Sequence, residues 1–352
     1  MASTTAFANA RRSIEEACRT GLDPRALRLA VLPILRRITG FDAYAWLLTD
    51  PETGVGSSPI ADVPCLAELP TLISLKYQTR VNRWTRLTKP VATLIEATAG
   101  DLAQSLMWRE MLQRYQVSDM ASCVSRDRFG CWGFLDLWRI APAPPFSEAE
   151  RAFLTAIAEP ITAGLRRGQA GTFAANSHAR EAPQGPVVLL LSPDLDVRAQ
   201  TQQTQEYLRV LVPPDADHDP IPASAYNVAA QLLAREAGTD SQPPLARVHL
   251  SEGIWLTLRA ARMAGRASGR SDIAVGIETA SASDRLLVFS RAHAFSERET
   301  ELLLHLAGGA DTRTAAQAMY VSEHTVQDYL KVIFAKTDSH SRRALLARAL
   351  GR

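Results

Sequence analysis

Polar side chains that can hydrogen-bond another molecule recur at helical spacing between residues 323 and 336. Ser322 is a good N-cap, and Val326, Leu330 and Ile333 recur on one predicted helix face. The opposite face carries a set of amide, imidazole, carboxylate and ammonium groups: Glu323, His324, Gln327, Asp328, Lys331 and Lys336. Groups of these types can bond the edges of nucleic-acid bases, so the face predicts recognition in a DNA groove.

Three further helices are predicted to hold that face in place. Ser296 and Glu299 have the spacing of a capping box at the start of the first, and Gly308 ends it. The second contains small residues that allow close packing, and Tyr320-Val321-Ser322 turns the chain into the third. A fourth helix is predicted at about 341–350. The order is that of a helix-turn-helix domain, predicted to occupy 293–352.

This segment resembles LuxR-type DNA-binding domains. Ser322, Thr325-Val326, Ile333 and Lys336 stand at the spacing of that family, and Arg342 begins the last helix. The resemblance implies that the third helix enters the major groove and that the last helix helps to pair two domains. Two positions depart from the family pattern: Tyr329 stands where His is usual, and Ala315 where a larger aliphatic residue is usual.

The resemblance also implies roles for single residues. Thr325, Lys336 and Arg313 are placed to contact phosphates. Gln327, Asp328 and Lys331 lie where the family reads base edges, and the chemically matched bases are adenine, cytosine and guanine in that order.

Charge limits how tightly one such domain can bind DNA. From Phe295 onward the chain has eight Lys/Arg and seven Asp/Glu, a balance of 8 − 7 = +1. Because phosphate neutralisation supplies much of DNA affinity, we expect a homodimer on double-stranded DNA. An interaction scaffold that keeps this fold without binding specific DNA is the alternative.

Residues 1–168 are predicted to form an α+β domain. Strand patterns at 44–49, 120–125 and 131–138, with a return strand from 55, alternate with helical patterns at 25–38, 66–77, 102–115 and 147–167. The order predicts an antiparallel sheet flanked by helices. It resembles a GAF domain in this order and in the stretch 133–139, which implies a fold that often holds a small molecule. The residues that GAF domains use for known ligands do not occur, so the ligand is unidentified.

A linker is predicted at 169–185, followed by a second α+β domain at 186–292. Strands are expected at 187–191, 197–200, 246–250, 255–262 and 272–278, and helices at 204–212, 224–237 and 285–292. This order resembles a PAS domain, a class that dimerises and binds flavin, haem or metabolites. The segment contains no Cys for a flavin adduct, and His218 and His249 are expected to have surface or structural roles, with haem ligation as the alternative.

Composition and motifs exclude several other classes. The net charge is +2, and no apolar run approaches the ~18 residues that span a bilayer. Cys18, Cys65, Cys123 and Cys131 form no zinc pattern; buried thiols are expected, with a Cys123–Cys131 redox pair as the alternative. The acidic run at 215–219 lacks the Gly and Glu of a calcium loop. No catalytic motif occurs. We therefore expect a cytoplasmic one-component transcriptional regulator that is not an enzyme and needs no metal or cofactor.

Overall fold

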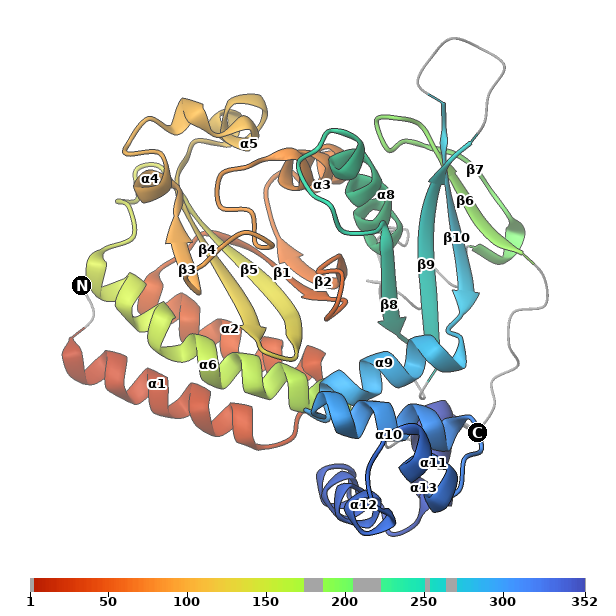
Figure 1. Cartoon of the computed structure of the whole chain (residues 1–352). Helices are drawn as coiled ribbons and strands as arrows, with labels where there is room; N and C mark the ends of the chain where they lie inside the picture. Colours follow the sequence, from red (N-terminus) through yellow and green to blue (C-terminus); the bar gives the residue numbers. More distant parts are fainter. Residues whose placement is uncertain (1–2, 174–185, 205–222, 251–253, 264–270, 352) are drawn as a thin grey trace.

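The chain forms two α+β units and a C-terminal helical unit (Figure 1). The computed structural model describes residues 3–173, 186–204, 223–250, 254–263 and 271–351. We call residues 3–173 the first unit, the described residues from 186 to 279 the second unit, and 293–351 the helical unit. Helix α9 (Ala282–Ala292) connects the last two. The fold class predicted from the sequence is confirmed.

The first unit contains a five-stranded antiparallel sheet in the order β2-β1-β5-β4-β3. Helices α1, α2 and α6 cover one face, and α3, α4 and α5 lie on the other (Figure 1). The strands are β1 Ala43–Thr49, β2 Gly56–Asp62, β3 Val91–Thr93, β4 Val117–Asp127 and β5 Gly130–Ile140. The helices are α1 Thr4–Arg19, α2 Pro24–Thr39, α3 Leu69–Gln78, α4 Leu94–Ala97, α5 Leu106–Glu110 and α6 Glu148–Gly171.

Both faces of this sheet are buried, and β5 shows it most clearly. Its residues 131–139 are all buried, so apolar side chains occur on both faces of the strand. Leu135 and Leu137 pack with the layer of α1, α2 and α6, whereas Trp138 packs with α3 and α5. Helix α6 begins with the capping box predicted by sequence, Ser147 and Glu150.

The second unit repeats the strand order of the first. Its antiparallel sheet runs β7-β6-β10-β9-β8, which corresponds position by position to the order in the first unit. The elements are β6 Val187–Leu191, β7 Val197–Gln200, α8 Ala223–Glu236, β8 Leu245–His249, β9 Trp255–Arg262 and β10 Ile273–Thr279.

Helix α8 joins the two units into one body. Its residues 223–231 are all buried, because the helix packs on its own sheet and also on α3 and β2 of the first unit. One apolar cluster contains Val55, Tyr77 and Trp84 of the first unit together with Ala225 and Val228 of α8. Asn227 lies so close to Gly56 that a Cβ at Gly56 would stand 2.9 Å from its amide oxygen, so a larger residue there would have to displace α8 side chains.

Buried ion pairs complete this interface. Asp50 is fully buried, and its carboxylate accepts bonds from the backbone N–H and the guanidinium of Arg247. The same carboxylate accepts the N–H groups of Glu52 and Thr53 in its own turn. At the other end, Arg83 and Asp240 are paired at 2.7 Å. Polar groups that are both buried and satisfied in this way fix one arrangement of the two units.

Sequence prediction succeeded for the strands and missed the breaks in one helical segment. β6 and β9 have the predicted bounds. The segment 102–115 is helical as predicted, but it is divided into α5 and two short 3₁₀ segments, Leu102–Gln104 and Leu112–Tyr115. Asp101 and Ser105 accept backbone N–H groups two and three residues ahead, which starts new turns and interrupts one continuous helix. Helix α1 and strand β3 were not predicted.

Other predictions fall partly outside the described residues. The predicted helix at 204–212 does so beyond Thr204, as do His218 and the acidic run at 215–219. At the predicted linker, α6 continues to Gly171 and Phe173 is buried. The four cysteines are free, and burial raises the pKa of Cys123 to about 12. Within the described ranges, no helix is long and apolar enough to cross a membrane.

We expect Asp50→Ala to lower the free energy of unfolding by about 3 kcal/mol or more, because it removes a buried carboxylate that accepts the guanidinium of Arg247 and the backbone N–H groups of Glu52, Thr53 and Arg247. Asp62→Ala is the control: its pair with Arg36 is exposed, and its loss should cost less than about 1 kcal/mol. Urea titration followed by tryptophan fluorescence measures both. Equal effects would show that the buried pair does not hold the units together.

Candidate nucleic-acid interface

Four helices form the helical unit, and two of them make the helix-turn-helix. They are α10 Glu297–Ala307, α11 Thr312–Ala318, α12 Glu323–Thr337 and α13 Arg342–Leu350. Buried Ala315 and Ala316 let α11 lie close to α12. Tyr320 takes a left-handed backbone conformation (φ 55°) that reverses the chain. Ser322 then caps α12 by accepting the N–H of Thr325.

One face of α12 is fixed in the core and the other is exposed. Val326, Leu330 and Ile333 are at most 2% exposed, as their spacing predicted. His324, Gln327, Asp328 and Lys331 are exposed on the other face. In Figure 1 this helix lies at the bottom of the molecule, away from both sheets. The two α+β units therefore leave the exposed face of α12 open.

The charged groups on this face neutralise one another. The ammonium of Lys331 donates to Asp328 at 3.0 Å, and His324 lies 3.6 Å from the same carboxylate. The bond from Lys331 lowers the pKa of Asp328. To contact base edges, Asp328 and Lys331 would have to give up their mutual ion pair. The bases would be the better oriented partners only at a matching DNA sequence.

The start of α11 lies beside this face. Gln327 of α12 donates to the hydroxyl of Thr312 at 3.3 Å, which places the exposed Arg313 next to α12. Thr325 is half-buried, with its hydroxyl 2.9 Å from that of Ser322. Arg342, the first residue of α13, also bonds Thr312. Sequence reasoning did not select Arg342 as a site residue, although its place at the first position of α13 was a usable signal.

Lys336 lies elsewhere and makes internal contacts. Its ammonium is 2.6 Å from Glu299 of α10 and donates to the carbonyl of Ala294 at 2.9 Å. Glu299 is 6% exposed and also accepts the N–H of Ser296 in the capping box. The structure thus groups Arg313, Thr325, Gln327, Asp328 and Lys331 together, and it places Lys336 in the support of α10.

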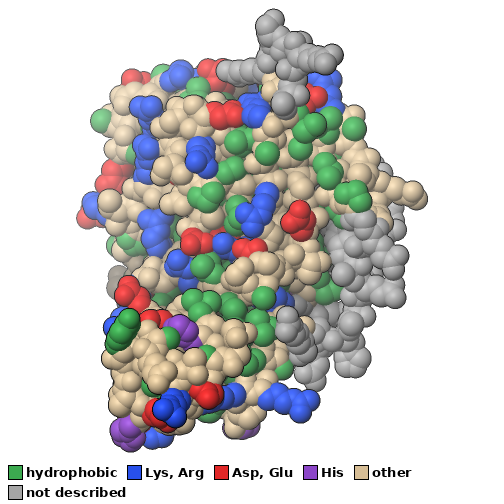
Figure 2. All heavy atoms as spheres, turned by 45° about the vertical axis from the view of Figure 1, so that its right-hand side comes forward, with side chains coloured by type: hydrophobic (Ala, Val, Ile, Leu, Met, Phe, Trp, Pro, Cys, Tyr) green, Lys and Arg blue, Asp and Glu red, His purple; other side chains and the backbone are tan. Residues whose placement is uncertain are grey.

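Charge is mixed over the surface of the helical unit. On the face drawn in Figure 2, cationic and anionic side chains alternate over the helices at the bottom, with no broad basic field. This agrees with the balance of eight cations and seven anions. Long-range electrostatic attraction between the helical unit and DNA is accordingly expected to be small.

A compact helix-turn-helix whose second helix has an exposed polar face is the architecture of nucleic-acid-binding domains. Residues 293–349 match the family described as "Bacterial regulatory proteins, luxR family", and this part of the chain is a LuxR-family helix-turn-helix domain. The family is one of regulators rather than enzymes. No curated protein matches the chain.

Several solved structures are similar in part. SdiA in complex with octanoyl-rac-glycerol is 11% identical, with 99% of this chain and 97% of that chain covered and a TM-score of 0.35. The VqmA dimer of Vibrio cholerae is 16% identical over 49% and 84%, with a TM-score of 0.18. Bacteriophytochrome RpBphP3 of R. palustris is 13% identical over 79% and 63%, with a TM-score of 0.32. The family match alone carries the assignment of the helical unit.

Lys336 and Lys331 should separate support from recognition. We expect Lys336→Met to lower the free energy of unfolding by about 1–3 kcal/mol, because Glu299 stays buried without its partner. Lys331→Met should change it by less than about 0.5 kcal/mol, since the pair with Asp328 is exposed. Thermal unfolding of the two variants measures this, and a stable Lys336→Met would contradict the supporting role.

Stability should also depend on pH through His293, at the junction of α9 and α10. Burial lowers its pKa to about 4, and its Nδ1 lies 3.1 Å from the carbonyl of Lys336. The unfolded chain takes up a proton near pH 6.5, so stability is complete above that pH and falls as pH decreases toward 4. The loss should reach up to about 2 kcal/mol by pH 5.

His293→Gln should remove that share of the pH dependence. His249, whose pKa burial also lowers to about 4, keeps its own share and serves as the internal comparison. Unfolding curves between pH 5 and 8 provide the measurement. Identical pH profiles for the variant and the parent protein would show that His293 is not the group.

Proposed function

We propose that the protein is a transcriptional regulator that binds double-stranded DNA as a homodimer, under the control of its two α+β units. The observation that carries this proposal is the exposed polar face of α12 in a LuxR-family domain. The protein would act where the DNA is, in the cytoplasm, and the ligand or partner that controls it acts on the first or second unit.

The proposal assigns a DNA contact to each predicted residue on α12 and at the start of α11. Gln327 pairs with adenine and Lys331 with guanine, while Asp328 accepts from cytosine. Thr325 and Arg313 contact phosphates on either side, and Arg342 joins them through Thr312. The phosphate contact expected of Lys336 stays a prediction, and it would require the ammonium to leave Glu299 and the carbonyl of Ala294.

Control is proposed to act through the position of the helical unit. α9 packs on α6 of the first unit and leads into α10. The guanidinium of Arg285 in α9 donates to the carbonyls of Arg348 and Ala349 at the end of α13. A change in the first two units that shifts α9 therefore shifts the helical unit, and half-sites about one DNA turn apart accept only one spacing of two such units.

The test is selection of bound sequences from randomised DNA with the full-length protein at two salt concentrations. We expect an enriched palindrome. Gln327→Ala with Lys331→Ala should weaken binding of the dimer to it at least about 800-fold, since two base contacts of about 1–3 kcal/mol are lost in each of two subunits. Arg313→Ala should weaken all sequences alike and reduce the salt dependence.

Arg235→Ala is the control, because this arginine is exposed on α8, far from the helical unit. Sequence-blind binding, or none, would favour the interaction scaffold. The observation for the scaffold is Tyr320, a tyrosine 95% exposed in the turn before α12, where a protein partner could cover it. Repeating the selection with cell extract separates a scaffold from a regulator that lacks its ligand.

A further inference from the structure

A groove runs along α6 of the first unit, outside the helical unit and its DNA-binding face. It lies between α6, the β4–β5 hairpin and the segment before β3, and its volume is about 620 Å³. That volume is within the usual range of small-molecule sites, about 300–1,000 Å³. We call it the basic groove, after Lys89, Arg126, Arg128 and Arg166, which line it.

Positive charge is in excess in the basic groove. The four cations face two carboxylates, Asp127 and Glu159. Asp127 is already saturated: it accepts the N–H groups of Phe129, Gly130 and the Trp132 indole, and its other oxygen binds Arg166 at 2.9 Å. Two cationic charges are therefore left without a carboxylate in the groove, by the difference 4 − 2 = 2.

The guanidinium groups are held in place by their surroundings. Arg126 donates to the carbonyls of Leu87 and Trp84. Arg128 and Arg166 both stack on the ring of Phe129, at 4.6 and 5.1 Å from its centre. Planar donors fixed in this way lose little entropy when they bind a planar or tetrahedral anion.

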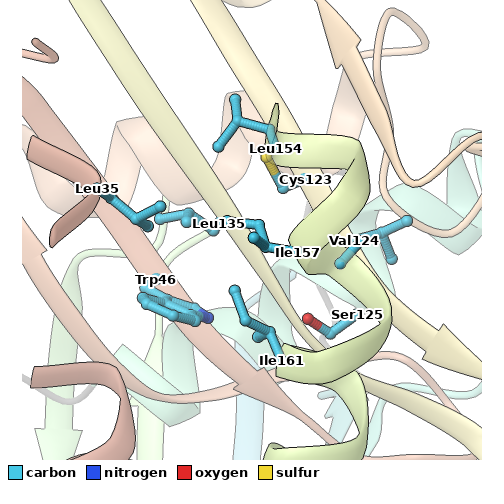
Figure 3. A pocket seen from close by; sticks show the side chains of 10 residues that line it. Leu35, Trp46, Cys123, Val124, Ser125, Leu135, Leu154, Ile157 and Ile161 are labelled. Atoms are coloured by element: carbon cyan, nitrogen blue, oxygen red, sulfur yellow. The ribbon is translucent and has the colours of Figure 1, made fainter. Parts of the chain in front are cut away.

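The inner wall of the groove is apolar and leads under α6. Val124 and Ala158 line both the groove and a small pocket between α6 and the sheet, with room for about one water molecule, ≈ 20 Å³. Figure 3 shows the indole nitrogen of Trp46 and the hydroxyl of Ser125 directed toward each other across this pocket. Trp46 is 1% exposed, and its indole N–H has no hydrogen-bond partner within the described residues. A buried donor of this kind is normally satisfied.

We infer that the basic groove binds an organic anion: a carboxylate or phosphate head group on Lys89, Arg126, Arg128 and Arg166, and an apolar portion against Val124 and Ala158. An inorganic anion would satisfy the cations and leave the apolar wall uncovered. A neutral apolar molecule would leave the excess charge in place. Only a molecule with both parts matches the two surfaces.

The groove is connected to the helical unit by α9. Arg291 of α9 donates to the carbonyl of Phe129 at 2.9 Å and lies 3.8 Å from Glu52. An anion bound to Arg128 and Arg166 would pull on the two guanidinium groups that stack on Phe129. Phe129 lies at the tip of the β4–β5 hairpin, and its carbonyl is the group that Arg291 of α9 bonds. That this contact controls DNA binding rests on the proposed function, whereas the site itself does not.

The site is tested by isothermal titration of the full-length protein, without DNA, with a panel of hexanoate, benzoate and phenyl phosphate. Acetate and inorganic phosphate test the head group alone, and benzyl alcohol tests the apolar portion alone. We expect at least one of the three larger anions to bind with one-to-one stoichiometry, at least fivefold more tightly than acetate, inorganic phosphate or benzyl alcohol.

Two variants of different kinds locate the binding. Lys89→Gln with Arg128→Gln removes cations that have no polar partner among the described residues, and Thr155→Trp fills the groove without changing its charge. Each should weaken the anion at least fivefold. Arg235→Gln, an exposed arginine on α8, is the matched control and should leave the affinity unchanged.

No saturable binding by any of the three larger anions overturns the inference, as does binding that both groove variants leave unchanged. DNA binding is measured separately by fluorescence anisotropy. Anion binding without DNA binding would sink the proposed function and keep the site, and DNA binding without anion binding would do the reverse.

Discussion

A single apolar cluster of aromatic rings ties the helical unit to the rest of the molecule. Phe173, at the end of the first unit, stacks on Trp255 of β9 at 4.8 Å and meets the edge of Phe289 in α9 at 5.2 Å. Phe289 in turn contacts Phe295, the residue before the cap of α10. Residues of all three units belong to the same buried core. The orientation of α12 toward DNA therefore depends on packing that the first two units share, because a close-packed core transmits displacement rather than absorbing it.

That dependence gives the interface between the first two units its importance. α8 is buried on both sides, and the Asp50–Arg247 and Arg83–Asp240 pairs fix its surroundings. Two units joined by a buried helix and buried ion pairs cannot rotate freely about a linker, so control by hinge motion between them is disfavoured. The element that connects both units to the helical unit is α9. It contacts α6 and α13, and its Arg291 reaches the hairpin beside the basic groove. A signal that enters at the groove has a short route to the helical unit.

Most of the secondary structure could be predicted from sequence patterns, whereas little of the packing between the units could. Alternating and capped patterns located the strands and α12, since these depend on neighbours within a few residues. The face of α12 was also predictable, because Val326, Leu330 and Ile333 define which side is buried. The internal contacts of Lys336 were not predictable, because its partners Glu299 and Ala294 lie far along the chain. The packing of the two units through α8 was not predictable for the same reason. The pattern of a helix buried on both sides shows only that it is apolar, and Arg247, the partner of Asp50, is 197 residues away.

The charges on the exposed face of α12 bear on the proposal that control acts through the position of the helical unit. Asp328 and Lys331 neutralise each other, and the helical unit as a whole is almost uncharged. In the proposed regulator, one copy would gain little from phosphates, and useful affinity would require two copies to meet two half-sites at once. Simultaneous binding would depend steeply on spacing, so a small displacement of α9 would change the affinity without altering any DNA contact. A strongly basic domain would bind DNA in every arrangement and would lose that sensitivity. In that proposal, the weak charge on α12 makes affinity sensitive to spacing, and the contacts of α9 with α6 and α13 relay the displacement.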